Sequence, residues 1–243
     1  MTPLKSLNTV PFVSHVMRLV RHARTHGVAR AGYSLSQAVL QLPGLRNGLC
    51  FGAVEIFHRY VDPWQSNTPI PRAFSVRVAN GSDVPELADY FGDPNRIQRR
   101  FQRGDVCLMT LCREKVCAAV WFALGPDDYQ EDWDALRCMF QFPADTTWCF
   151  DGKGTKWGAW GSLMAKVPDY LREQGVREVF TMIGCNNWQS IDSHKSLGYR
   201  SLGVITCFGA LQQKKVLFRE YGRRWQRLPG SMGNLKLVAD PAE

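Results

Sequence analysis

Residues 146–199 read TTWCFDGKGTKWGAWGSLMAKVPDYLREQGVREVFTMIGCNNWQSIDSHKSLGY, and this stretch decides the fold. Its apolar periodicity predicts a short buried strand, a glycine-containing turn, a helix, a second strand and a shorter helix. The first helix is indicated by apolar residues at spacings of three and four, which share one face: Trp160, Leu163, Met164, Val167 and Leu171. Gly175 is expected to end this helix, because glycine readily adopts the left-handed conformation that follows a last helical turn.

A turn rich in glycine and lysine stands directly ahead of this helix. It contains Gly154, Gly158 and Gly161 among Lys153 and Lys156. The first amides of a helix have no partner within the helix, so a helix that begins after a glycine turn can bind phosphate at its N-terminus. The turn is therefore a candidate phosphate site.

A second pattern follows the second strand and consists of Asn187, Ser190, His194, Gly198 and Tyr199. Together with the turn, it resembles the GNAT acyltransferase superfamily. The signature of that family is a strand, an Arg/Gln-x-x-Gly-x-Gly/Ala turn and a helix. After the next strand come Asn, then Ser or Ala, an aromatic residue or His, and a closing Gly-aromatic pair. The resemblance covers residues 74–210.

The resemblance implies a mixed α/β (α+β) fold with a mostly antiparallel central sheet flanked by helices. It implies that the sheet splays open between the strands at 146–150 and 176–183, and that acetyl-CoA or another acyl-CoA binds there as co-substrate. Two registers of the turn are left open, Thr155–Trp160 and Lys156–Gly161, and neither begins with Arg or Gln. The implied coenzyme-binding residues are Lys156, Trp157, Gly158, Ala159, Trp160, Gly161, Asn187 and Ser190. For Asn187 and Ser190, capping of the following helix is the alternative.

Acyl transfer to an amine needs a group that accepts a proton from the amine. The departing thiolate can leave with a proton from a donor or without one. His194 stands where many GNAT enzymes have Tyr, so the resemblance implies a general acid, with an inert surface or capping histidine as the alternative. Among the carboxylates Asp151, Asp128 and Glu131, the first candidate for the base is Asp151, because it directly follows a strand of the splay.

The composition bounds the rest of the chain. With 243 residues, 45% of them apolar, it can bury a substantial core and is most simply one domain with appendages. The formal net charge of +8 favours anionic partners. The eight cysteines form no CxxC pair, so no metal site is expected, and a reducing cytoplasm is the expected location. No apolar run approaches the roughly twenty residues that a membrane-spanning helix needs.

Four segments are expected along the chain: a basic, amphipathic and helical N-terminal arm (1–62), a Pro-containing linker (63–73), a GNAT-like domain (74–215) and a basic tail (216–243). The arm has no acidic residue before Glu55, and its pattern over 10–26 is that of an amphipathic helix. Residues 49–60, near its end, are expected to form a strand or a helix. Three interpretations of the arm stay open: an extra helix packed on the domain, a segment that attaches peripherally to anionic lipid, and an organelle transit peptide.

Three further stretches carry expectations. Residues 106–124 predict a hairpin of two apolar strands at the centre of a sheet. Residues 95–105 place Arg96, Arg99, Arg100 and Arg103 on one helical face, which is either solvated or a wall of the acceptor or coenzyme site. The acidic, aromatic segment 125–145 predicts a surface loop, with a cation-binding rim as the alternative.

The sequence thus predicts transfer of an acyl group from acyl-CoA to the amine of a small molecule or amino sugar. The alternatives are a catalytically silent GNAT-like module that binds nucleic acid or anionic membrane, and a transferase that uses aminoacyl-tRNA. Nucleophile-elbow, Walker and HExxH motifs are absent from the sequence, and GKGTKWG falls short of a Rossmann fingerprint. Whether the chain is a monomer or a homodimer is left open.

Overall fold

The computed structural model describes residues 32, 36, 49–62, 64, 69–125, 128–133, 136–142, 145–210, 213–224, 226–228 and 233–236. The amphipathic pattern at 10–26 lies outside the described residues. Within the described ranges, no helix is long and apolar enough to span a bilayer.

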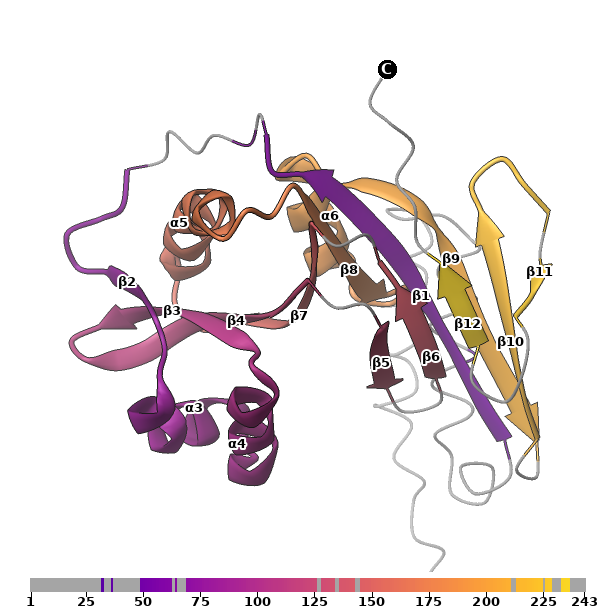
Figure 1. The fold of residues 1–243 in the computed structure, drawn as a ribbon, viewed down its shortest axis with the longest axis horizontal. Coiled ribbons are helices and arrows are strands. Elements are labelled where there is room, and N and C mark those ends of the chain that lie inside the picture. The colour runs from indigo at the N-terminus through magenta and orange to yellow at the C-terminus, as the bar shows by residue number, and fades with distance from the viewer. Residues whose placement is uncertain are drawn as a thin grey trace, which may run out of the picture.

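The strands form a nine-stranded sheet in the order β11-β10-β9-β1-β8-β7-β4-β3-β2 and a three-stranded sheet in the order β12-β6-β5 (Figure 1). Their bounds are β1 Leu49–Tyr60, β2 Ser75–Val78, β3 Val106–Cys112, β4 Lys115–Leu124, β5 Asp128–Trp133, β6 Leu136–Gln141, β7 Thr146–Gly154, β8 Glu178–Gly184, β9 Arg200–Ala210, β10 Gln213–Glu220, β11 Gln226–Arg227 and β12 Gly233–Lys236. The helices are the 3₁₀ turn Gly81–Asp83, α3 Val84–Phe91, α4 Pro94–Arg103, α5 Ala159–Glu173 and α6 Trp188–Ser196.

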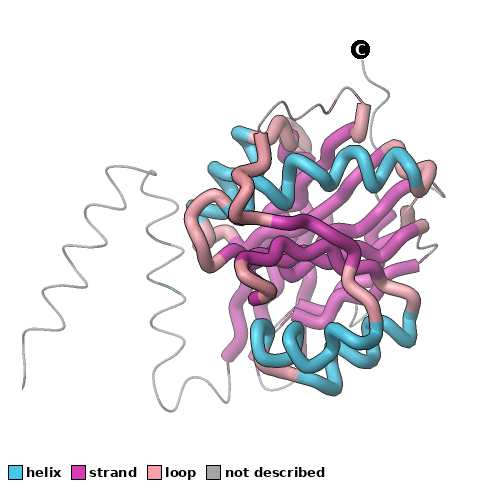
Figure 2. Tube along the Cα trace, turned by 90° about the vertical axis from the view of Figure 1, so that its left-hand side faces the viewer, coloured by secondary structure: helices cyan, strands magenta, loops and turns pink. Residues whose placement is uncertain are grey.

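The large sheet is mostly antiparallel, as expected. The β7–β8 pair is parallel, whereas β1–β8, β1–β9, β3–β4 and β4–β7 are antiparallel. Helices lie on both faces of the sheet (Figure 2). This confirms the expected mixed α/β class. The β3–β4 hairpin is also confirmed, with positive φ angles of 50° at Arg113 and 64° at Glu114 in its two-residue turn.

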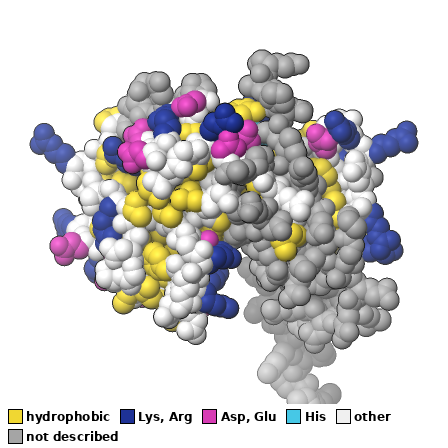
Figure 3. All heavy atoms as spheres, viewed as in Figure 1, with side chains coloured by type: hydrophobic (Ala, Val, Ile, Leu, Met, Phe, Trp, Pro, Cys, Tyr) yellow, Lys and Arg dark blue, Asp and Glu magenta, His cyan; other side chains and the backbone are white. Residues whose placement is uncertain are grey.

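Strand alternation distributes three apolar clusters over the two faces of the large sheet. On one face, α5 and α6 pack through residues such as Leu163, Val167 and Ile191. On the other face, Leu87 of α3 and Ile97 of α4 cover β3 and β4. Beside them, the small sheet contributes Phe140 to a cluster over β1, β8, β9 and β10. The charged side chains visible in Figure 3 lie at separate points around that view, several of them in pairs of opposite sign.

Strand β1 is the main departure from the sequence analysis, which placed residues 49–60 in the N-terminal arm. It lies between β8 and β9 and pairs with both, from Val54↔Gly184 to Tyr60↔Glu178 and from Leu49↔Ala210 to His58↔Arg200. Because both of its faces are covered by other elements, its apolar residues do not alternate with polar ones. The sheet likewise takes in β10, which runs past the expected start of the tail at 216.

The acidic segment 125–145 also differs from expectation. The predicted surface loop is wrong, since β5 and β6 form an antiparallel hairpin and β12 joins β6 in parallel. The segment was misread because its polar residues leave no clear two-residue apolar period.

The position of β1 gives a testable consequence. Deleting residues 1–60 removes β1 and exposes the inner edges of β8 and β9, whereas deleting residues 1–48 keeps the strand. We expect the first variant to be insoluble, because open apolar edges aggregate, and the second to be the more soluble of the two. Soluble yield and thermal unfolding measure the difference. A soluble, cooperatively folding 61–243 fragment would contradict the central place of β1.

Candidate functional site

The candidate site lies where two parallel strands separate. β7 and β8 pair only from Thr146↔Glu178 to Cys149↔Thr181. Beyond that point β7 continues alongside β4 and β8 continues alongside β1. A cavity of about 900 Å³ occupies the opening. The splay that the resemblance implies is therefore present.

A β-bulge in β7 sets the direction of the side chains that line this cavity. Trp121 of β4 pairs with Phe150 and Ala119 with Lys153, so β7 holds one more residue than β4 between these pairs. Asp151 lies in the bulge with a φ of 46°, a value that is uncommon outside glycine. Bulges re-aim side chains and recur beside active sites.

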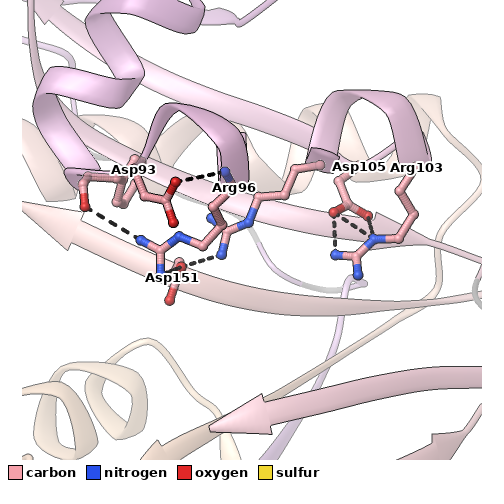
Figure 4. Close-up of polar contacts among 7 residues, drawn as sticks. Asp93, Arg96, Arg103, Asp105 and Asp151 are labelled. Atoms are coloured by element: carbon pink, nitrogen blue, oxygen red, sulfur yellow. Dashed lines mark hydrogen bonds and ion pairs between the residues drawn. The ribbon is translucent and has the colours of Figure 1, made fainter. Parts of the chain in front are cut away.

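The bulge directs Asp151 to the α4 side of the sheet. Its Oδ2 accepts a hydrogen bond from Nη2 of Arg100 and lies 3.7 Å from Nη1 of Arg96 (Figure 4). Arg100 is 8% exposed, and its Cζ lies 4.8 Å from the ring centroid of Phe150 and 5.2 Å from that of Trp121. A buried guanidinium that packs over two aromatic rings is a fixed cation, so it fixes the carboxylate that it binds. The catalytic role of Asp151 stays a prediction.

Gly152 and Gly154 lie on the opposite side of β7, under the indole of Trp160. A Cβ on Gly152 would come within 2.6 Å of Trp160 Cη2, and one on Gly154 within 3.1 Å of Trp160 Cβ. These two glycines therefore make room for an aromatic ring. The sequence analysis did not single out Gly152, although its place two residues before Gly154 was a signal.

The glycine turn leads into α5. Gly158 is the N-cap residue, with a φ of 79°, and it has no side chain to cap the helix. Ala159 N donates to Lys156 O at 3.2 Å, whereas no hydrogen bond to a described residue uses the amides of Trp160 and Gly161, which stay available to a ligand. Thr155 N donates to Cys117 O at 2.9 Å, and Thr110 Oγ1 donates to Ala159 O at 3.2 Å. These bonds hold the turn against β4 and the start of α5 against β3. Trp157 is 97% exposed.

Most of the predicted coenzyme-binding residues line the cavity, namely Lys156, Trp157, Gly158, Trp160, Asn187 and Ser190, together with His194 and Asp151. Ala159 is buried below the turn, and Gly161 does not line the cavity. Lys156 Nζ donates to Cys112 Sγ at 3.1 Å. The sequence analysis missed Thr181 and Met182 of β8, which line the other wall and carry no motif of their own.

Helix α6 brings the remaining predicted residues to the cavity. Asn187 is its N-cap, and its Oδ1 accepts from Ser190 N at 3.2 Å, so the capping alternative is confirmed for Asn187. His194 is buried, with Nδ1 2.7 Å from the Ser190 carbonyl oxygen. Its ring centroid lies 5.1 Å from that of Tyr199 and 6.5 Å from that of Trp160.

Burial lowers the pKa of His194 below its ordinary 6.5, and the hydrogen bond with Ser190 only partly offsets this. The imidazole is therefore neutral at pH 7. In the neutral form the proton on Nδ1 faces the Ser190 carbonyl oxygen, which leaves the Nε2 lone pair as the proton acceptor. A neutral histidine must gain a proton before it can act as the general acid that the sequence analysis predicted, and that role stays a prediction.

In the part of the chain that the structure describes, no group of three or more His, Cys, Asp or Glu side chains is placed to hold a metal ion.

The splayed parallel pair, the mostly antiparallel sheet and the glycine turn ahead of α5 give the chain a GNAT-like fold. No protein-family model matches the chain, and no curated protein matches it by sequence.

Similar solved structures include a functionally unknown conserved protein from Staphylococcus epidermidis, with 14% identity, a TM-score of 0.49 and coverage of 71% of this chain and 66% of that one. A Drosophila protein has 14% identity, a TM-score of 0.48 and coverage of 73% and 58%. An acetyltransferase from the GNAT family of Colwellia psychrerythraea has 10% identity, a TM-score of 0.47 and coverage of 72% and 61%. This chain spans less than two thirds of the length of each of these proteins.

The packing of Trp160 on Gly152 can be tested by a double-mutant cycle. We expect Gly152→Ala to lower the free energy of unfolding by about 1–3 kcal/mol, because the added methyl group overpacks the indole. In a Trp160→Leu background the same change should cost less than about 0.5 kcal/mol, since the two sites are coupled. Denaturant unfolding gives these values.

Gly161→Ala is the matched control. A Cβ there meets no atom within 4 Å, and alanine favours a helix by up to about 1 kcal/mol, so stability should hold or rise. An equal loss for Gly152→Ala in both backgrounds would refute the contact.

Proposed function

We propose that this protein transfers an acyl group from acyl-CoA, either acetyl-CoA or a longer homologue, to the amine of a small molecule. The observation that carries the proposal is the opening between β7 and β8, whose mouth is formed by the glycine turn and the N-terminus of α5. An acyltransferase also needs a proton-transfer group in that opening, and His194 lines it.

The residues of the turn fit the phosphate end of such a coenzyme. The free amides and the dipole of α5 favour an anion at Gly158, and Lys156 lines the same part of the cavity. Gly158 has a positive φ, at which any other residue would be strained. Since glycine has no side chain, the backbone at this position can approach the phosphates of the coenzyme. Trp157 offers an exposed ring at the mouth, on which a planar base can stack.

The reaction forms a bond between the acceptor nitrogen and the acyl carbon and breaks the bond between that carbon and sulfur. An amine is mostly protonated at neutral pH and must lose a proton before it attacks. Neutral His194 can accept one proton from the ammonium on Nε2 and then return it to the departing thiolate. The attacking nitrogen carries a second proton into the tetrahedral intermediate, and that proton is released to water as the amide forms. On this proposal His194 begins the cycle as the base and ends it as the acid, so a single residue serves both steps.

The coenzyme site is tested by a pair of glycine variants on α5. Gly158→Asp places bulk and negative charge at the mouth of the cavity. Gly175→Asp introduces the same residue at a similar φ of 72°, beyond the other end of the helix. We expect acetyl-CoA to raise the melting temperature of the parent and of Gly175→Asp. Its affinity for Gly158→Asp should be at least about tenfold weaker, a change of about 1.4 kcal/mol.

Isothermal titration of acetyl-CoA measures these affinities, and a longer acyl-CoA should be titrated beside it. Equal affinity of acetyl-CoA for folded Gly158→Asp and for the parent would show that the coenzyme does not bind at this turn. If neither coenzyme binds the parent protein, the proposed function falls.

The role of His194 is tested by its pH dependence. Glutamine at this position can keep the bond to the Ser190 carbonyl oxygen but cannot accept a proton, so we expect His194→Gln to lower turnover by about 10²-fold or more. The folded pKa lies below 6.5, so kcat/KM of the parent should fall as pH drops through that lowered value. The same limb should be missing in the variant. If the parent instead loses activity as pH rises through this range, His194 acts from its protonated form and the base role is wrong.

A further inference from the structure

The surface on the α4 side of β7 is the part of the site that the coenzyme proposal leaves unused. We call it the α4 cluster, and it consists of Asp93, Arg96, Arg100, Arg103, Asp105, Asp151 and Lys153. Figure 4 labels five of them, Asp93, Arg96, Arg103, Asp105 and Asp151. It meets the cavity through Asp151 and Lys153, which line both. Its four cations outnumber its three carboxylates. An amine that reaches the cavity from this side therefore passes a surface of net positive charge, which disfavours a polycation.

Most of the cluster is already satisfied by its own contacts. Arg103 Nε donates to both carboxylate oxygens of Asp105 at 3.0 Å. Lys153 Nζ donates to Tyr90 O at 2.7 Å. Asp93 Oδ1 caps α4 by accepting from Arg96 N at 3.0 Å. These groups supply charge and rigidity, and they are not free to take a ligand.

Arg96 differs from them because its guanidinium is loosely held. Its side chain is 42% exposed, and Nη1 lies 3.7 Å from Asp151 Oδ2. Nη2 lies 3.5 Å from Phe91 O, at the outer limit of a hydrogen bond. Among the described residues, its Nε has no hydrogen-bond partner. Nε is buried, so the part of the guanidinium that can meet a ligand is its outer pair of nitrogens. Because Nη1 and Nη2 make only weak contacts, they can turn to bind a planar anion through two hydrogen bonds.

Asp151 has the complementary property. Arg100 and Arg96 both contact Oδ2, and no hydrogen bond from a described residue reaches Oδ1. Because Arg100 is buried and packs over the rings of Phe150 and Trp121, the carboxylate keeps this orientation. One carboxylate oxygen of Asp151, which lines the cavity, and the loosely held guanidinium of Arg96, which lies beside it outside the cavity lining, are therefore neighbours.

We propose that the acceptor is a small amine with an anionic group, a carboxylate or a phosphate, close to its amino group. The ammonium binds Asp151 Oδ1 and the anion binds the guanidinium of Arg96. Because these two groups are neighbours, the charges of the acceptor are only a few bonds apart, as in an amino acid or an aminoalkyl phosphate. The proposal rests on the proposed acyl transfer and narrows its acceptor.

Matched pairs of acceptors test the inference on the full-length protein. Each common amino acid is compared with its carboxamide, and ethanolamine phosphate with ethanolamine, so that only the anion changes. Binding is measured by titration without coenzyme, and acyl transfer is measured separately with acetyl-CoA. We expect at least one member that carries the anion to bind, and to react, at least about tenfold better than its partner without the anion. Whether carboxylates or phosphates show this preference identifies the anion.

Arg96→Gln should reduce that preference to within about threefold, because it removes the charge that binds the anion. Arg99→Gln is the control, since Arg99 is exposed on the same helix and its Nε donates to Asn95 O. It should keep the full preference. If the amines that lack an anionic group, or polyamines, bind equally well or better, the inference is overturned. So does a preference that survives Arg96→Gln, or a panel in which no member binds. Charge-selective binding without acyl transfer overturns the proposed function alone.

Discussion

The structure depends on one break in backbone pairing. After Cys149 and Thr181, strands β7 and β8 stop sharing hydrogen bonds although they lie at the centre of a nine-stranded sheet. Each backbone amide and carbonyl group needs a partner, so a central gap is tolerated only if both halves of the sheet are completed elsewhere. On one side β4 holds β7, and on the other side β1 holds β8. The N-terminal strand is therefore as necessary to the cavity as the motif that lines it. The inner edges are left to offer backbone donors and acceptors to whatever enters.

A single extra residue in β7 gives the two sides of the sheet different tasks. The bulge turns Asp151 toward α4 and its arginines, while Gly152 and Gly154 face α5 and accommodate Trp160. On the proposed function, the coenzyme occupies the α5 side and the acceptor approaches from the α4 side. The positive φ of Asp151 is accompanied by its contact with Arg100, whose guanidinium makes cation–π contacts with Phe150 and Trp121.

The sequence predicted what local pattern controls. The order from β7 to α6 follows from apolar spacing, and the turn at Arg113 and Glu114 follows from a polar break between two apolar runs. It left residues 49–60 open as a strand or a helix of the N-terminal arm and did not predict their place in the sheet, because the partners of β1 lie more than a hundred residues away and the strand is covered on both faces. The pairing of Asp151 with Arg100 spans 51 residues and depends on the bulge. The sequence analysis assigned Gly154 to a phosphate-binding turn and did not single out Gly152, whereas both glycines make room for the indole of Trp160.

The central claim is that the opening between β7 and β8 is the coenzyme site, and amide hydrogen exchange tests it most directly. The full-length protein is compared with and without saturating acetyl-CoA. The account predicts slower exchange at the separated ends of both strands, residues 151–154 and 182–184, and at the turn 155–161, with little change in β2 and β10. Protection confined to another surface, with the splay unchanged in the presence of bound coenzyme, would contradict the account.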